Sequence, residues 1–182
     1  FHIFDMSISG IFIEGKKEIR YLEMSDTVRS KSLLLRRHEK NFFLYGNPEE
    51  IVNVHAYLNE LKTALGECKR FNSTHDLQYL ENEIARYEER FKHIEALTSS
   101  FRQEFSSLKP RHKEYTRFFP IIESTVLERP LVNAELLEGI LSPGNSQPII
   151  RTLKELDSEI NALRKNGEEI LTLSNHLDKS AR

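Results

Sequence analysis

Two clusters of basic residues are the part of this sequence that could do chemistry. The first cluster runs from residue 29 to residue 40 and includes Arg29, Arg36, Arg37 and Lys40. Arg29 and Arg36 are seven residues apart, so on a helix they share one face. A guanidinium binds a carboxylate through two parallel hydrogen bonds, and helical bundles build ligand sites from facing side chains. The cluster predicts a pocket between helices for a small carboxylate, unless Arg36 and Lys40 instead pair with acidic residues of neighbouring helices.

The second cluster lies between residues 109 and 117. Arg111 and Arg117 are its arginines, and we expect them to be anion ligands for the same reason. The chain therefore contains two candidate anion sites, although its net charge is only −2.

Residues for metal binding or nucleophilic catalysis do not form a complete motif. A di-iron bundle needs Glu-x-x-His pairs, and the sequence contains none. Glu89 and His93 are four residues apart, as on a solvated helix face. The zinc-protease pattern that begins at His38 has Phe42 in place of its second histidine. There is no Gly-x-Ser-x-Gly motif, and Cys68 falls on an apolar helix face. We expect no metal, no cofactor and no enzymatic activity.

Composition narrows the class of protein further. The 182 residues include 26 basic and 28 acidic side chains, 7 glycines, 6 prolines and 1 cysteine. Near-neutral charge argues against nucleic acid as a partner, and one cysteine cannot form an intrachain disulfide or a Cys-based zinc module. High charge density with few turn residues is typical of long amphipathic helices. No run of about 18 uncharged apolar residues occurs, so we expect no membrane span within these residues.

Apolar residues at alternating steps of three and four predict long helices. The clearest series starts at Leu77 and continues to Leu108. Gly46 should end one helix in a left-handed conformation, and Thr74, or Asp76 just after it, should cap the start of another. We expect helices over residues 3–45, 48–71, 75–109, 111–128, 131–141 and 147–180.

Helices of about 40 residues are rods roughly 60 Å long, which bury their apolar faces only against one another. We therefore predict an all-α fold, an elongated antiparallel bundle of four to six helices in a single domain, 1–182. If the free ends of the first and last helices are level, Gly15 and Gly167 lie at one height, and we expect the two backbones to approach closely there. The first 13 residues contain one charge, Asp5, as in a helix that emerges from an apolar environment into water.

The run 35–47, Leu-Arg-Arg-His-Glu-Lys-Asn-Phe-Phe-Leu-Tyr-Gly-Asn, resembles the end of the first helix in helical bimodular sensor domains. These are extracytoplasmic ligand-binding domains of bacterial chemoreceptors and sensor histidine kinases. The segment 160–173 is similar to the family's membrane-returning helix, with Gly167 and an Ile-Leu pair. The resemblance implies two stacked bundles that share long helices. It also implies a small organic acid, such as a tricarboxylic-acid-cycle intermediate or acetate, bound through arginines, of which Arg36 and Arg37 match the motif.

The resemblance further implies a periplasmic domain of an inner-membrane protein, anchored by membrane helices on either side of this chain, and a homodimer. Signalling would be a small shift of the last helix against the first, driven by a ligand that binds one packing better. The residues leave one alternative open, an intracellular helical scaffold or coiled-coil adaptor that binds a partner helix through an exposed apolar stripe.

Overall fold

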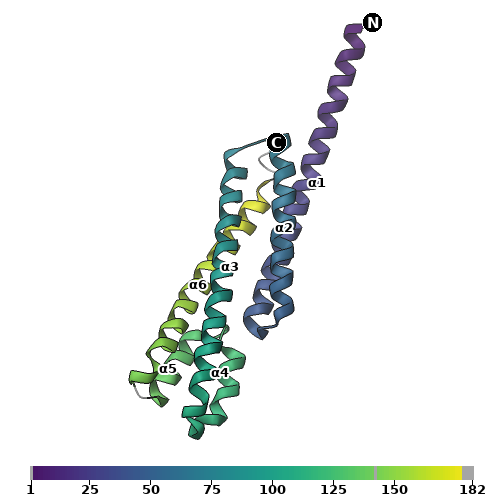
Figure 1. Ribbon diagram of the computed structural model, residues 1–182. Coiled ribbons are helices and arrows are strands. Elements are labelled where there is room, and N and C mark those ends of the chain that lie inside the picture. The colour runs from purple at the N-terminus through teal and green to yellow at the C-terminus, as the bar shows by residue number, and fades with distance from the viewer. Residues whose placement is uncertain (1, 142, 178–182) are drawn as a thin grey trace.

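The computed structural model describes residues 2–141 and 143–177, with the side chains of residues 15–141, 144 and 147–177. This part of the chain is almost entirely helical and contains no strand (Figure 1). It confirms the prediction of an elongated, antiparallel, all-α bundle. The elements are α1 (His2–Tyr45), α2 (Pro48–Phe71), α3 (His75–Leu108), the 3-10 turns η1 (Lys109–Arg111) and η2 (Lys113–Phe118), α4 (Phe119–Thr125), α5 (Pro130–Ile140) and α6 (Pro143–Asn175).

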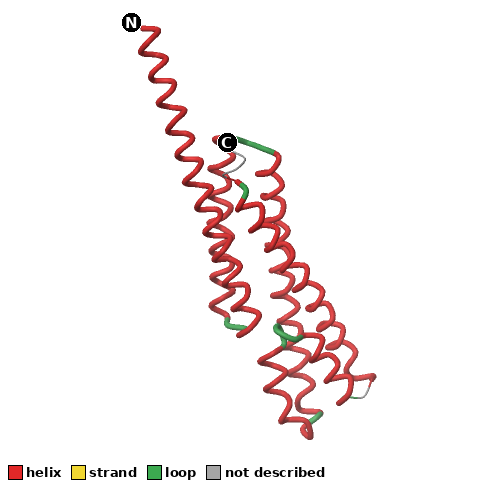
Figure 2. Tube along the Cα trace, turned by 180° about the vertical axis from the view of Figure 1, so that it is seen from behind, coloured by secondary structure: helices red, strands yellow, loops and turns green. Residues whose placement is uncertain are grey.

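The helices are arranged in two tiers that share α3 and α6 (Figures 1 and 2). In one tier α3 and α6 pack with α1 and α2, and in the other they accompany the shorter α4 and α5. The tiers meet where α1 ends, because α1 also contacts α4. Residues of α1, α6 and the α4–α5 turn are thereby brought to one level of the molecule.

The core is built from the apolar series that the spacing predicted. On α3, all members of the series from Leu77 to Leu108 are buried, and they form one core with Val28, Leu35 and Phe42 of α1 and other buried residues. Cys68 of α2 is also fully buried, and this burial raises the pKa of its thiol to about 11. A thiol that stays protonated and has no access to solvent is a packing residue and not a nucleophile.

The predicted helix end at Gly46 is confirmed, and of the two predicted caps, Thr74 and Asp76, it is Thr74 that caps α3. Gly46 has a φ of 63°, and its N–H donates to the carbonyl of Phe42 at 2.8 Å. The hydroxyl of Thr74 accepts a hydrogen bond from the N–H of Leu77 at 3.3 Å, which satisfies one of the free donors at the start of α3.

Replacing Gly46 with alanine should lower the free energy of unfolding by about 1–2 kcal/mol, because a Cβ disfavours left-handed backbone. Gly66, exposed inside α2, is the matched control, since a Cβ added there would have no heavy atom within 4 Å. Gly66→Ala should therefore raise the stability by up to about 1 kcal/mol through helix propensity. Urea denaturation measures both changes. A Gly46→Ala variant as stable as the parent would contradict the left-handed end of α1.

The structure differs from the predicted helix over residues 111–128. This segment contains η2, the short α4 and a turn, with η1 just before them. Pro110 and Pro120 have no N–H to donate, and Tyr115 lies outside the helical region with φ −105° and ψ 16°. The prolines therefore divide the segment into short turns, where a continuous helix would need unbroken backbone hydrogen bonds.

The last helix begins earlier than predicted. It starts at Pro143 and not at residue 147, and it continues through Pro148. A proline fits the first helical position, where its missing N–H would have no partner in any case. The predicted end of this helix at residue 180 lies outside the described residues.

The predicted approach of Gly15 to Gly167 is wrong. The hydroxyls of Ser32 in α1 and Ser174 in α6 share a hydrogen bond of 2.8 Å, so the start of α1 extends well beyond the level of α6 (Figure 1). A Cβ on Gly15 would meet no heavy atom within 4 Å. A Cβ on Gly167 would overlap Nη1 of Arg36 and lie 2.8 Å from its Cδ. Gly167 thus makes room for an arginine of α1.

Candidate anion-binding groove

A groove of about 630 Å³ lies between α1, α6 and the turn that joins α4 to α5. Its size is within the range of small-molecule sites. We call it the α1–α6 groove. Its lining contains four basic and two acidic side chains, with apolar residues between them: Leu33, Arg36, Arg37, Glu39, Lys40, Phe43, Leu44, Glu128 and Arg164.

Helix geometry explains why three predicted residues face this groove together. Lys40 comes four residues after Arg36 and three after Arg37, so it lies one turn along α1 from both, and the three side chains point to one side of the helix. Arg36 is at the border of the buried face, with 24 % of its side chain exposed, whereas Arg37 and Lys40 are exposed. Neither Arg37 nor Lys40 forms an ion pair with a described residue, so their charges are available to an anion.

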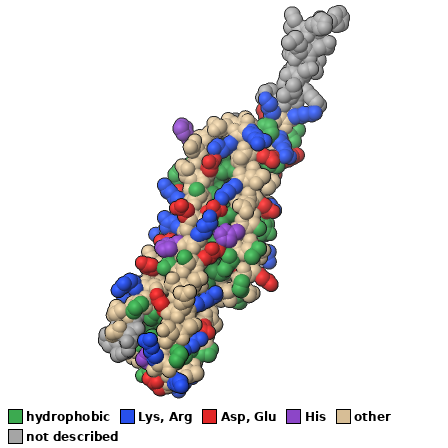
Figure 3. Space-filling model, viewed as in Figure 1, with side chains coloured by type: hydrophobic (Ala, Val, Ile, Leu, Met, Phe, Trp, Pro, Cys, Tyr) green, Lys and Arg blue, Asp and Glu red, His purple; other side chains and the backbone are tan. Residues whose placement is uncertain are grey.

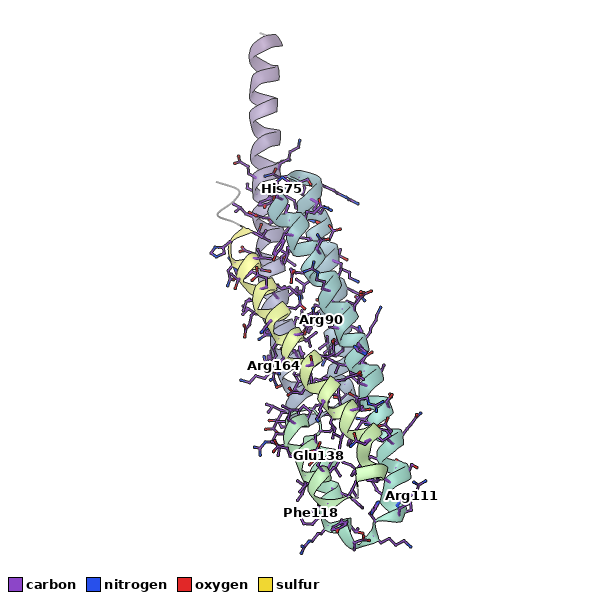
Figure 4. All side chains as sticks on the ribbon, turned by 90° about the vertical axis from the view of Figure 1, so that its left-hand side faces the viewer. His75, Arg90, Arg111, Phe118, Glu138 and Arg164 are labelled. Atoms are coloured by element: carbon purple, nitrogen blue, oxygen red, sulfur yellow. The ribbon has the colours of Figure 1, made fainter. Side chains whose placement is uncertain are left out.

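Arg164 of α6 supplies a cation from the opposite wall. Its guanidinium lies over the ring of Phe43 of α1, 5.4 Å from the ring centroid. Figure 4 shows Arg164 near the middle of α6, far from the end of the molecule where Arg111 and Phe118 lie. The groove therefore has basic side chains on both helices that it separates, and an anion between them would contact α1 and α6 at once.

Arg36 connects the groove to the core. Its Nη1 donates to Oε2 of Glu39 at 2.6 Å and to the backbone carbonyl of Arg164 at 3.2 Å. The second oxygen of Glu39 accepts a hydrogen bond of 2.7 Å from the hydroxyl of Tyr87 on α3. Because Gly167 has no Cβ, it leaves a space on α6, the notch at Gly167, and the side chains of Arg36 and Glu39 lie against it. The Arg36–Glu39 pair of α1 is thus bonded to α3 through the carboxylate and to α6 through the guanidinium.

Burial dominates the electrostatics of this carboxylate. The Glu39 side chain is 3 % exposed, and its desolvation raises the pKa of the carboxyl above the ordinary value. The charge of Arg36 and the hydrogen bond from Tyr87 act in the opposite direction. The pKa of Tyr87 is also well above its usual range, because its hydroxyl is buried and faces Glu39. The pair is therefore a neutral phenol that donates to a carboxylate whose ionisation is disfavoured.

A second buried polar pair lies next to this one. The amide of Asn166 on α6 donates to Oε2 of Glu83 on α3 at 2.6 Å, and Arg86 donates to the other oxygen at 3.0 Å. The side-chain amide oxygen of Asn166, Oδ1, is buried without a hydrogen-bond partner among the described atoms. Glu83 and Asn166 are not part of the groove lining.

Three other predicted site residues lie outside the groove. Arg29 pairs with Asp26 on the same helix, although it shares a face with Arg36. Arg111 and Arg117 are exposed on the 3-10 turns at the far end of the molecule (Figure 4), where Arg117 lies 4.8 Å from the centroid of the Phe118 ring. The structure brings neither of them near the first cluster, so the two basic clusters are separate.

Three residues of the groove, Arg164, Glu128 and Glu39, were not among the predicted site residues. Glu39 could have been found, because it continues the buried face of α1 at a step of four from Leu35. Arg164 and Glu128 could not, because only the tertiary arrangement places them opposite the first cluster.

Glu89 and His93 line a shallow surface depression between α3 and α6 together with Glu159. Nδ1 of His93 lies 3.5 Å from a carboxylate oxygen of Glu159. Within the part of the chain that the structure describes, no group of three or more histidine, cysteine or acidic side chains could hold a metal ion. Basic and acidic side chains are mixed over the face seen in Figure 3.

None of the helices, as far as they are described, is long and apolar enough to cross a membrane. No protein-family model, no curated protein and no solved structure gives a significant match to this chain.

Proposed function

We propose that this chain is the extracytoplasmic sensor domain of a bacterial transmembrane receptor, a histidine kinase or a chemoreceptor, and that it binds a small organic acid in the α1–α6 groove. The observation that carries the proposal is the convergence of Arg36, Arg37 and Lys40 with Arg164 across one groove of suitable volume. Guanidinium groups recognise carboxylates in two-pronged fashion. The role is binding and not catalysis, and it needs no cofactor.

The positions of α1 and α6 support a signalling role. The two helices form the walls of the groove, and the start of α1 and the end of α6 point to the same end of the bundle (Figure 1). A ligand that binds one packing of these helices better than another would shift α6 against α1. In this proposal the shift reaches the cytoplasm through flanking membrane helices, and the receptor acts as a periplasmic homodimer.

An organic acid at about 100 times its dissociation constant should raise the free energy of unfolding by about 2.7 kcal/mol. We expect this in a thermal-shift panel of L-malate, succinate, citrate and acetate. The double variant Arg37→Gln, Lys40→Gln removes two exposed charges without touching the core, and it should bind at least about tenfold more weakly, because a hydrogen bond to a charged group contributes about 1.5–3 kcal/mol.

The matched control is Arg111→Gln, Arg117→Gln, which removes two exposed charges at the far end of the molecule. This variant should bind as the parent does. A panel in which no acid raises the melting temperature would contradict the proposal. Loss of binding in the control alone would move the site away from the groove.

One observation favours the alternative of a helical scaffold. Ile19 and Leu22 of α1 are 60 % and 41 % exposed, and Leu33, on the same side of the helix, is 54 % exposed. Exposed apolar residues on one side of a helix can bind a partner helix. The acid panel separates the two functions, because a scaffold would gain no stability from any carboxylate.

A further inference from the structure

Glu39 is an acidic group in the wall of a basic groove. It lines the α1–α6 groove, yet only 3 % of its side chain is exposed. The groups that face it are Arg36 on its own helix, the Tyr87 hydroxyl on α3 and Arg164 on α6. The nearest cation is Arg36, whose Nη1 lies 2.6 Å from Oε2 of Glu39, and Arg36 also lines the groove. An anion that binds Arg36 in the groove shares this guanidinium with Glu39.

A bound anion acts on Glu39 in two ways that have the same sign. Its negative charge repels the buried carboxylate, and the repulsion is strong where water is excluded. The anion also draws on the donors of Arg36, which is the main group that stabilises the ionised form of Glu39. Both effects raise the pKa of Glu39 above a value that burial has already raised.

We propose that binding of an organic acid in the α1–α6 groove is coupled to the uptake of one proton by Glu39 from solvent. The inference rests on the proposed function, and it adds the regulation of the same site by pH. A neutral Glu39 holds Arg36 less tightly. Because Nη1 of Arg36 also binds the carbonyl of Arg164 on α6, proton uptake loosens a contact between the two helices that form the groove.

The direction of the pH dependence follows from linkage. The complex binds more protons than the free protein, so affinity for a fully ionised ligand rises as the pH falls. The slope is at most about tenfold per pH unit for one proton. Affinity becomes constant at low pH, where Glu39 is neutral in both states, and at high pH, where it is ionised in both.

Isothermal titration calorimetry of the chain with L-malate, and with acetate as a second ligand, tests the proposal. Titrations at about pH 6.5 to 8, where these acids are ionised, are repeated in buffers with different heats of ionisation. The buffer dependence gives the number of protons taken up per bound acid. We expect a value between zero and one that changes with pH, and a value near zero for Glu39→Gln.

Glu83→Gln is the matched control, because Glu83 is also buried on a core helix but does not line the groove. It should retain the proton uptake of the parent. Tyr87→Phe is a second variant that does not depend on the folding of Glu39→Gln. Tyr87→Phe removes a hydrogen bond that favours the ionised form of Glu39, so the pKa of Glu39 should rise and proton uptake should move to higher pH.

Binding of malate or acetate without proton uptake would overturn the role of Glu39 and leave the proposed function standing. Uptake that persists in Glu39→Gln would overturn it as well, since the proton would then go to another group. If none of the acids in the panel binds, the proposed function fails, and this inference fails with it.

Discussion

Replacing Phe91 with alanine should lower the free energy of unfolding by about 3–5 kcal/mol. Phe91 is fully buried, and its ring lies 5.4 Å from that of Phe42 on α1 and 5.3 Å from that of His55 on α2. One side chain of α3 thus packs against two other helices. Its removal leaves a cavity that rigid helices cannot close, so the loss exceeds the transfer free energy of the ring alone.

Tyr79→Ala is the control for this prediction. Tyr79 is an aromatic residue of the same helix, but it is 48 % exposed, so the change should stay within about 0.5 kcal/mol. Guanidinium denaturation followed by circular dichroism at 222 nm measures both variants. A loss of less than about 1 kcal/mol for Phe91→Ala would mean that α1 and α2 do not pack on α3 as described.

The long helices could be predicted because their apolar residues are periodic. On α3 the series from Leu77 to Leu108 needs no information beyond spacing, and each of its positions is buried. The turns around Pro110 and Pro120 could not be predicted from spacing. Proline removes a backbone donor, but it does not determine which turn replaces the helix. Short 3-10 turns also leave no repeating pattern of apolar residues in the sequence.

The candidate site could also be predicted only in part. Arg36, Arg37 and Lys40 share a side of α1, so their convergence follows from helix geometry alone. Arg29 shares that geometry too, but Asp26, one turn before it, holds its charge on the helix surface. Which residues of other elements lie opposite this cluster depends on the axial alignment of α6 with α1. The expected approach of Gly15 to Gly167 required level ends of the two helices, whereas α1 extends beyond α6 and Gly167 lies opposite Arg36.

Gly167→Ala should lower the free energy of unfolding by about 2–4 kcal/mol, although alanine is the better helix former. The added Cβ would overlap Nη1 of Arg36 and lie 2.9 Å from Oε1 of Glu39. Arg36 must leave, because Glu39 is enclosed by α3, and the buried carboxylate then loses its cation. Breaking such a pair costs about 3–5 kcal/mol, and the gain in helix propensity offsets about 1 kcal/mol of that.

Gly15→Ala is the control within α1, since its Cβ would meet no heavy atom within 4 Å. It should raise the stability by up to about 1 kcal/mol. Urea denaturation of both variants tests the difference in sign. A Gly167→Ala variant more stable than the parent would show that Arg36 does not occupy the notch.

A double-mutant cycle with Glu39→Gln identifies the cause of the loss at Gly167. If the cost of Gly167→Ala comes from an unpaired buried charge, it should fall by about 1–2 kcal/mol when residue 39 is uncharged. If it comes from crowding of the two helices, glutamine leaves the same atoms in place and the cost should not change. Coupling of the first kind would show that one arginine of α1, seated at a glycine of α6, links the groove to the packing of the two helices. The proposed signal requires that link.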